Sequence, residues 1–149
     1  MRKDEVVMRG QTPSGGTEVL NFRGVKEGSA YKLVEFSLYP STNIGANSFE
    51  LLGSITAGKS AIDPTNPNFN DDALIATAKF SESSSSNYVS DIVSVINDRF
   101  LITQNLILMV QETGNTTAVN WQCKFKRVEM AKAEEAVANY KQFMISDGS

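Results

Sequence analysis

Residues Trp121–Lys126 read WQCKFK and alternate strictly between apolar and polar side chains. In an extended chain Trp121, Cys123 and Phe125 share one face, because successive side chains point to opposite sides. This period of two is typical of a half-buried β-strand. The stretch therefore predicts a strand whose apolar face, including the single cysteine of the chain, enters a core.

The same alternation recurs along the chain at intervals of roughly ten residues. Tyr31–Tyr39 (YKLVEFSLY) places Val34, Phe36 and Leu38 on one face of a second clear strand. The further predicted strands are Glu5–Arg9, Glu18–Phe22, Phe49–Ile55, Leu74–Phe80, Asn87–Asp98 and Leu106–Gln111, and the opening stretch belongs to a strand over Val119–Val128. Short strands separated by Gly, Asn, Ser and Pro turns predict a mainly β fold, an antiparallel β-sandwich or a jelly-roll-like domain.

Two segments need a choice between alternatives. Several apolar side chains of Asn87–Asp98 fit helical spacing, but the β-branched residues around Ser94 favour a strand. Glu112–Thr117 (ETGNTT) has turn chemistry and lies between two predicted strands, Leu106–Gln111 and Val119–Val128. It is therefore predicted to join them as a hairpin.

One domain is expected, with a sandwich over residues 1–130 and a C-terminal helix over residues 131–146. Met1–Gly10 is expected to extend from the sandwich towards neighbours. The apolar side chains of the helix recur at alternating intervals of three and four residues, which makes one stripe. These possible subunit-interface residues are Met130, Ala133, Val137, Tyr140 and Met144. The stripe is predicted to pack either on the sandwich or on a neighbouring subunit.

Composition argues against several classes of function. The 149 residues include no histidine and one cysteine, Cys123, which removes the Ser–His and Cys–His dyads and the usual zinc ligands. Fourteen basic and seventeen acidic residues give a net charge of −3, which is not the balance of a nucleic-acid-binding module. No apolar run reaches membrane-spanning length, and the first residues do not read as a signal peptide. We expect no enzyme activity, no cofactor, no metal and no membrane partner.

Gly53–Ser60 (GSITAGKS) matches the phosphate-loop pattern G-x-x-x-x-G-K-[ST] letter for letter. A working phosphate loop leads directly into a helix N-terminus. Pro64 and Pro67 follow within one or two turns and prevent a helix there. The segment is therefore predicted to be a strand followed by a tight turn. Nucleotide binding through Lys59 remains a remote alternative.

A second alternative is a glycan-binding sandwich. Such modules stack sugars on exposed aromatic rings, sometimes beside a calcium ion. The candidate rings are Trp121, Tyr39 and Tyr88, and the candidate calcium ligands in the long loop are Asp63, Asp71 and Asp72. Core or interface packing is the competing interpretation of the aromatic residues.

Three stretches of the chain resemble small β-rich virion proteins of marine bacteriophages. They are Tyr31–Ser41 (YKLVEFSLYPS), Val95–Thr113 (VINDRFLITQNLILMVQET) and Val119–Met130 (VNWQCKFKRVEM). The resemblance implies a non-enzymatic coat, decoration or minor capsid protein of jelly-roll type, located in the virion after synthesis in the host cytoplasm. It implies copies of the same chain and other virion proteins as partners, and it transfers no functional residue.

Overall fold

The computed structural model describes residues 4–22, 28–42, 48–58, 60–83, 89–114, 117–131, 137–138, 141 and 145. Within these ranges the chain forms eight strands. They are β1 (Glu5–Thr12), β2 (Thr17–Leu20), β3 (Ser29–Pro40), β4 (Phe49–Ala57), β5 (Leu74–Ser83), β6 (Val89–Ile96), β7 (Leu106–Glu112) and β8 (Val119–Glu129).

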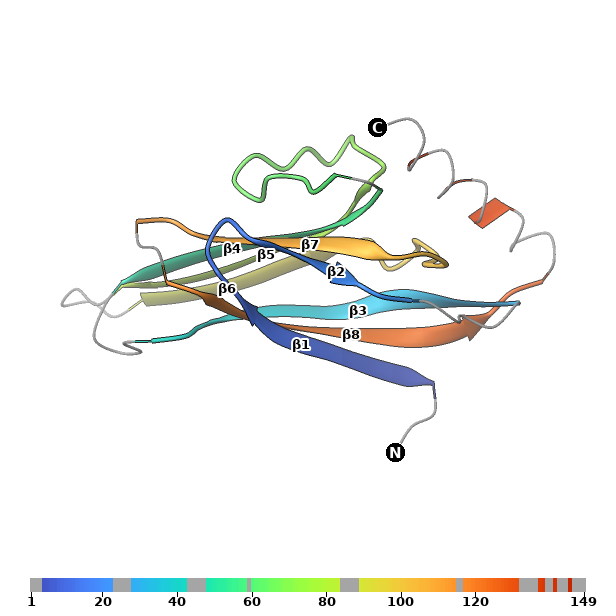
Figure 1. The fold of residues 1–149 in the computed structure, drawn as a ribbon, viewed down its shortest axis with the longest axis horizontal. Helices are drawn as coiled ribbons and strands as arrows, with labels where there is room; N and C mark the ends of the chain where they lie inside the picture. Colours follow the sequence, from blue (N-terminus) through green and yellow to red (C-terminus); the bar gives the residue numbers. More distant parts are fainter. Residues whose placement is uncertain are drawn as a thin grey trace.

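The strands form two sheets, in which every described pair is antiparallel. One sheet has the order β1-β8-β3 and the other the order β2-β7-β4-β5-β6. Figure 1 shows them as two layers, with β1, β8 and β3 below β2, β7 and β4. The prediction of a mainly β, antiparallel fold is confirmed, and each predicted strand corresponds to one of the eight.

The strand order is nested around the middle of the chain. β1 pairs with β8, β2 with β7, and β4 with β5. Full nesting would also pair β3 with β6; these two strands touch, but β6 is hydrogen-bonded to β5 instead. As a result one sheet has three strands and the other five, so the narrower sheet cannot cover the whole width of the wider one.

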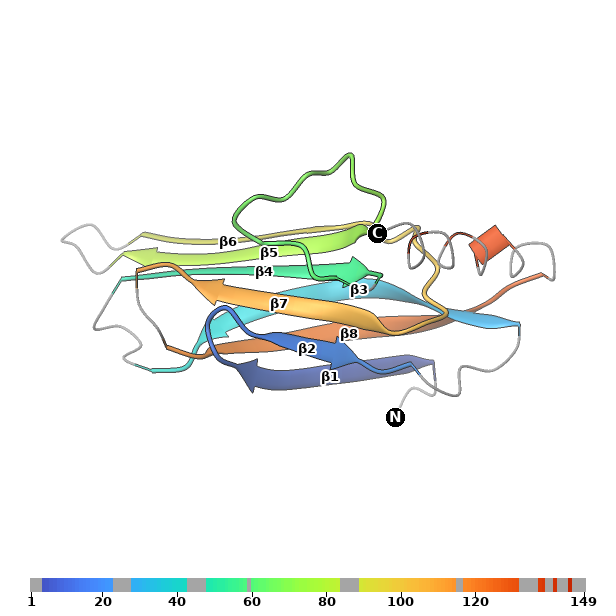
Figure 2. The same ribbon diagram turned by 45° about the horizontal axis from the view of Figure 1, so that its top comes forward.

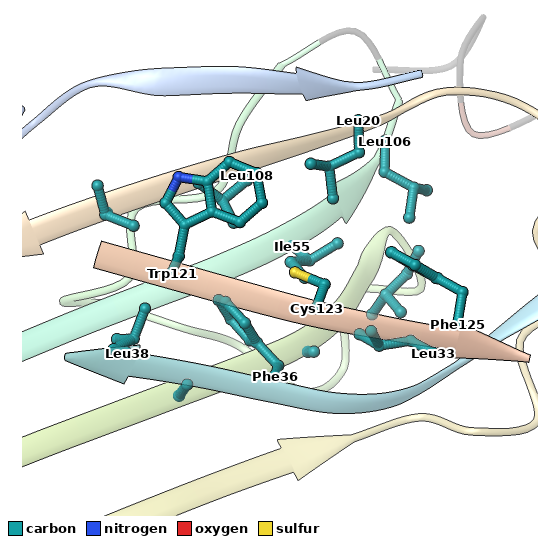
Figure 3. Packing of buried hydrophobic residues seen from close by; sticks show 14 of the residues in the cluster. Leu20, Leu33, Phe36, Leu38, Ile55, Leu106, Leu108, Trp121, Cys123 and Phe125 are labelled. Atoms are coloured by element: carbon teal, nitrogen blue, oxygen red, sulfur yellow. The ribbon is translucent and has the colours of Figure 1, made fainter. Parts of the chain in front are cut away.

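The core lies between the two sheets, where β8 contributes the alternating face seen in its sequence. Trp121, Cys123 and Phe125 are buried and face side chains of the other sheet such as Ile55 and Leu108 (Figure 3). Each fully buried apolar side chain of this size contributes about 2–3 kcal/mol relative to an exposed one. The predicted burial of Cys123 is confirmed, with none of its surface exposed.

The inward face of β3 differs from the prediction at one position. Val34 was expected beside Phe36 and Leu38, but its side chain is 39% exposed and Leu33 is fully buried instead. The register of β3 against β8 shifts between Leu33 and Glu35, so one extra residue is inserted there. Such a bulge reverses the alternation on one side of it, which strict period-two counting does not anticipate.

The predicted hairpin at Glu112–Thr117 is wrong. β7 pairs with β2 and β4, whereas β8 pairs with β1 and β3, so this connection crosses from one sheet to the other. Turn residues indicate that the chain reverses, but they do not specify which sheet receives the next strand.

The strand predicted over Glu5–Arg9 is confirmed as part of β1, but it belongs to the sandwich and does not extend away from it. Residues 5–10 belong to β1, whose eight residues pair with β8 from Glu5 opposite Lys126 to Thr12 opposite Val119. With β1 on one side and β3 on the other, β8 has hydrogen-bonding partners for its backbone N–H and C=O groups on both sides. The predicted helix over residues 131–146 lies largely outside the described residues.

Candidate assembly surface

The C-terminal stripe predicted as a subunit interface is described only in part. Met130 directly follows β8, is half-buried, and its backbone N–H donates to the Gly28 carbonyl at 2.8 Å. Val137 is 68% exposed. Ala133, Tyr140 and Met144 lie outside the described residues. The role of the stripe therefore stays a prediction, with Val137 as its exposed described member.

Other residues of the same segment contact the body of the protein. Ala138 is buried, and Ile145 packs against the core. The Lys141 ammonium lies 5.8 Å from the centre of the Phe100 ring, within the range of a cation–π contact. These three residues are spaced three and four apart, so the segment touches the body through a side different from that of Val137.

The glycine that opens the phosphate-loop pattern lies in the middle of a strand. Gly53 pairs with Ala78 of β5 and Val110 of β7, so its backbone belongs to the sheet ladder. A Cβ at this position would lie 2.8 Å from Cζ of Phe36, closer than such atoms approach. The predicted strand is confirmed, but the tight turn predicted at Ala57-Gly58 is not: Ala57 still belongs to β4, and Gly58, at φ +133°, is a bend that opens a long loop. Lys59 lies outside the described residues.

The long loop after β4 uses its acidic residues to build turns. Asp63 accepts hydrogen bonds from the backbone N–H and the hydroxyl of Thr65, at 2.9 and 2.7 Å, and these bonds lower its pKa. Asp71 accepts the Ala73 N–H at 2.9 Å. Among the described residues, no group of three or more His, Cys, Asp or Glu side chains is placed to hold a metal ion. The proposed calcium ligands Asp63, Asp71 and Asp72 are thus not brought together.

Two open hollows border this loop. One, of about 240 Å³, lies between Phe69 and the ends of β5 and β6 near Val95. The other, of about 450 Å³, is lined by residues such as Ala61, Asp72 and Ile145. Both are open to solvent and are lined by turn residues and strand ends.

The aromatic residues of the glycan alternative are separated by the fold. Trp121 is only 8% exposed, and its indole N–H donates to the Thr12 hydroxyl at 2.9 Å inside the core. Tyr39 is 51% exposed and packs edge-on against Phe80, with ring centres 5.5 Å apart. Tyr88 lies outside the described residues. Of the three, Tyr39 is the described ring with an accessible face.

Two of the described carboxylates, Glu35 and Glu112, make an ion pair and a hydrogen bond within the fold. Glu35 lies 3.6 Å from the Lys124 ammonium on the outer face of the three-stranded sheet. Glu112 is buried and accepts the Thr117 hydroxyl at 2.8 Å. Burial raises the pKa of the Cys123 thiol to about 12, so this thiol is not a nucleophile at neutral pH.

One edge strand, which the sequence did not point to as a site, carries three exposed apolar side chains. Ile92, Val93 and Val95 of β6 are 69%, 46% and 47% exposed. β6 is the outermost strand of the five-stranded sheet, as Figure 2 shows. Its sequence carried a signal, since apolar residues on both faces of a strand are typical of a buried central strand rather than an edge.

The other three edges differ from β6 in how they are protected. Charged side chains, short strands and bulges prevent edges from pairing with other chains. β2 has four residues, and β3 carries the register shift described above. The charged residues on these edges are Glu5 and Arg9 of β1, Glu18 of β2, and Lys32 and Glu35 of β3. β6 has one charged residue, Asp91, near its beginning.

No protein-family model and no curated protein sequence matches this chain. Within the described parts of the chain, no helix is long and apolar enough to cross a membrane.

Proposed function

We propose that this chain is a non-enzymatic structural protein of a bacteriophage particle, a coat, decoration or minor capsid component that assembles with copies of itself. The nested pairing of β1 with β8, β2 with β7 and β4 with β5 supports a jelly-roll-like sandwich. Jelly rolls form viral capsid subunits, and they also occur in lectins and cupins. The strand order is therefore consistent with a capsid subunit and with a lectin, and it does not distinguish between these functions.

The observation that carries the proposal is the exposed apolar edge of β6. A secreted or cytoplasmic monomer with such an edge would be prone to pair with other chains, and natural monomers protect their edges. In a protein that assembles with copies of itself, an exposed apolar strand edge can form the contact between subunits. The absence of histidine from the whole sequence is compatible with a role in packing rather than in acid–base chemistry.

The C-terminal segment supplies a second contact in this proposal. Ala138, Lys141 and Ile145 touch the body, and their spacing is that of one side of a helix. In such a helix Val137, Tyr140 and Met144 would form the adjoining side, turned towards a neighbouring subunit. Other virion proteins would be the remaining partners.

The proposal is tested by the mass of the purified protein and by the particles that it forms. Light scattering with size exclusion should show species larger than a monomer, and electron microscopy should show regular assemblies at high concentration. A variant with both Val137→Asp and Tyr140→Asp should form fewer or smaller assemblies, because two charges would be buried at the contact. A strictly monomeric wild-type protein at every concentration would contradict the proposal.

A glycan-binding module is the second candidate, and the exposed ring of Tyr39 is the observation in its favour. Jelly-roll lectins place such rings on accessible surfaces. This candidate predicts a monomer that binds oligosaccharides, with affinity lost in Tyr39→Ala. A glycan array together with the light-scattering experiment separates the two functions.

A further inference from the structure

We propose that the free edge of β6 pairs with β6 of a second copy of this chain, antiparallel across a two-fold axis and in the register centred on Ser94. This inference rests on the proposed self-association and identifies the surface that carries it. The occupant is a second copy, because the edge is complementary to itself in hydrogen bonding and in side-chain type.

The hydrogen-bonding pattern leaves alternate residues of β6 directed to the free edge. The backbone N–H of Asn97 donates to the Ile75 carbonyl of β5 at 2.8 Å. In an antiparallel ladder, residues alternate between pointing both backbone groups at one neighbour and at the other. The even-numbered residues Ile92, Ser94 and Ile96 therefore direct their N–H and C=O groups away from β5.

The side-chain sequence selects one register among those that this geometry allows. With Ser94 opposite its own copy, Ile92 lies opposite Ile96 and Val93 opposite Val95. Asp91 then lies opposite Asn97, whose amide can donate to a carboxylate. Centring the pair on Val93 instead would place Asp91 opposite Val95 and Ile92 opposite Ser94. Only the Ser94 register matches apolar with apolar on both faces of the strand.

The inward face of β6 is left partly exposed in one copy. Ile92 and Ile96 pair with Phe80 and Ala76 of β5, so they share the inward face of the sheet. Ile92 is nevertheless 69% exposed, although β3 of the three-stranded sheet touches β6. A second copy would bring its own Ile92 and Ile96 to the same place, which forms a cluster of four isoleucine side chains.

The outward face would be completed in the same way. Val93 and Val95 lie opposite Lys79 and Thr77 of β5 and are about half exposed. The Lys79 ammonium lies 4.0 Å from the Asp91 carboxylate, so the one charge near the start of the edge already has a partner on this side. One strand pair buries less than the roughly 800 Å² per partner of a standard interface. We therefore expect a reversible dimer that repeated contacts in a particle would reinforce.

The test compares two valines on the two edges of the same sheet. Val93 on β6 and Val19 on β2 both have exposed side chains. Val19 lies opposite Ile107 of β7, which is itself only partly buried, so Val19 is the matched control on the other edge. Val93→Lys should weaken dimerisation at least about tenfold, because both Val93–Val95 contacts across the interface are lost and two like charges are brought onto neighbouring strands. Val19→Lys should leave dimerisation unchanged. Sedimentation velocity over a roughly thousandfold range of concentration, around the micromolar values expected of small interfaces, measures both.

Each outcome decides a separate statement. Loss of dimer in Val93→Lys alone, with the same thermal melting curve for the monomers of both variants, supports the inference. Equal association of wild type and Val93→Lys contradicts the β6 interface but leaves self-association in place. A monomeric wild type contradicts both the interface and the proposed function. Capture of a strand from a different protein by a monomeric wild type would likewise contradict pairing between copies.

Discussion

β8 and β6 differ both in their position in the sheets and in the pattern of apolar residues along the strand. β8 lies in the centre of the three-stranded sheet, pairs on both sides, and alternates apolar and polar residues because one face is buried. β6 lies at an edge, pairs with β5, and carries apolar residues on both faces. β8 is complete within one copy of the chain. The pattern of β6 is that of a strand completed by something outside that copy.

The largest expected effect comes from removing an aromatic side chain from β8. Phe125 is fully buried and packs edge-on against Phe22, with ring centres 4.9 Å apart. Phe125→Ala should lower the free energy of unfolding by about 3–5 kcal/mol through lost burial and a residual cavity. Ile92→Ala on β6 should cost less than about 0.5 kcal/mol in the monomer. Urea unfolding of dilute protein measures the free energy of unfolding of both variants. Equal losses of stability would contradict the statement that β8 is buried in one copy and β6 is not.

The single thiol gives a second comparison between the strands. The pKa of Cys123 in the folded protein is about 12, above the ordinary 9.0, because burial disfavours the thiolate. Burial of the neutral thiol therefore contributes its full stabilisation below pH 9. As pH rises towards 12 the free energy of unfolding falls, by at most about 4 kcal/mol.

This effect is measured by the difference between wild type and Cys123→Ala in thermal unfolding at rising pH. The wild-type curve should fall more steeply above pH 9 than that of the variant. In native protein at neutral pH, Cys123 should resist thiol reagents, whereas a cysteine placed at exposed Ser94 should react at once in the monomer. Rapid modification of native Cys123 would show that β8 is not covered as described.

A third change tests the strand that resembles a phosphate loop. Gly53→Ala would push a methyl group against Phe36 and should cost about 1–3 kcal/mol of stability. Lys59→Ala should leave both stability and assembly unchanged, and ATP should not raise the melting temperature of the wild type. A melting temperature that rises with ATP in wild type but not in Lys59→Ala would revive nucleotide binding.

The smallest effects are expected from two ion pairs on the described surface, one beside each strand. Glu35 pairs with Lys124 of β8 at 3.6 Å, and Lys79 pairs with Asp91 of β6 at 4.0 Å. All four side chains are substantially exposed, so Glu35→Gln and Asp91→Asn should each change stability by less than about 1 kcal/mol. Asp91→Asn should also leave the dimer intact or strengthen it, since an amide replaces a charge at the edge. A dimer lost in Asp91→Asn would show that the charge of Asp91, and not the apolar pairs of the Ser94 register, holds the two copies together.

The sequence predicted the strands well because each has its own short-range pattern. Period-two alternation placed β8 and most of β3, and β-branched residues decided correctly for β6. The bulge at Val34 and the sheet that receives β8 after Glu112 were missed, since both depend on contacts between residues far apart in the chain. The edge position of β6 was missed for the same reason. Apolar residues on both faces of a strand indicate burial, but only the sheet order shows that, among the described strands, β6 is hydrogen-bonded to β5 alone.

The central claim, that β6 is completed by a second copy in the Ser94 register, is tested most directly by disulfide formation between two single-cysteine variants. In that register Val93 of one copy lies opposite Val95 of the other as a non-hydrogen-bonded pair, with Cα atoms about 4.5 Å apart and within reach of a disulfide. Buried Cys123 stays protected and does not interfere. A mixture of Val93→Cys and Val95→Cys proteins should form the mixed disulfide dimer under mild oxidation, in preference to either homodimer. Efficient homodimers of Val93→Cys, or no cross-link in the mixture, would contradict the account.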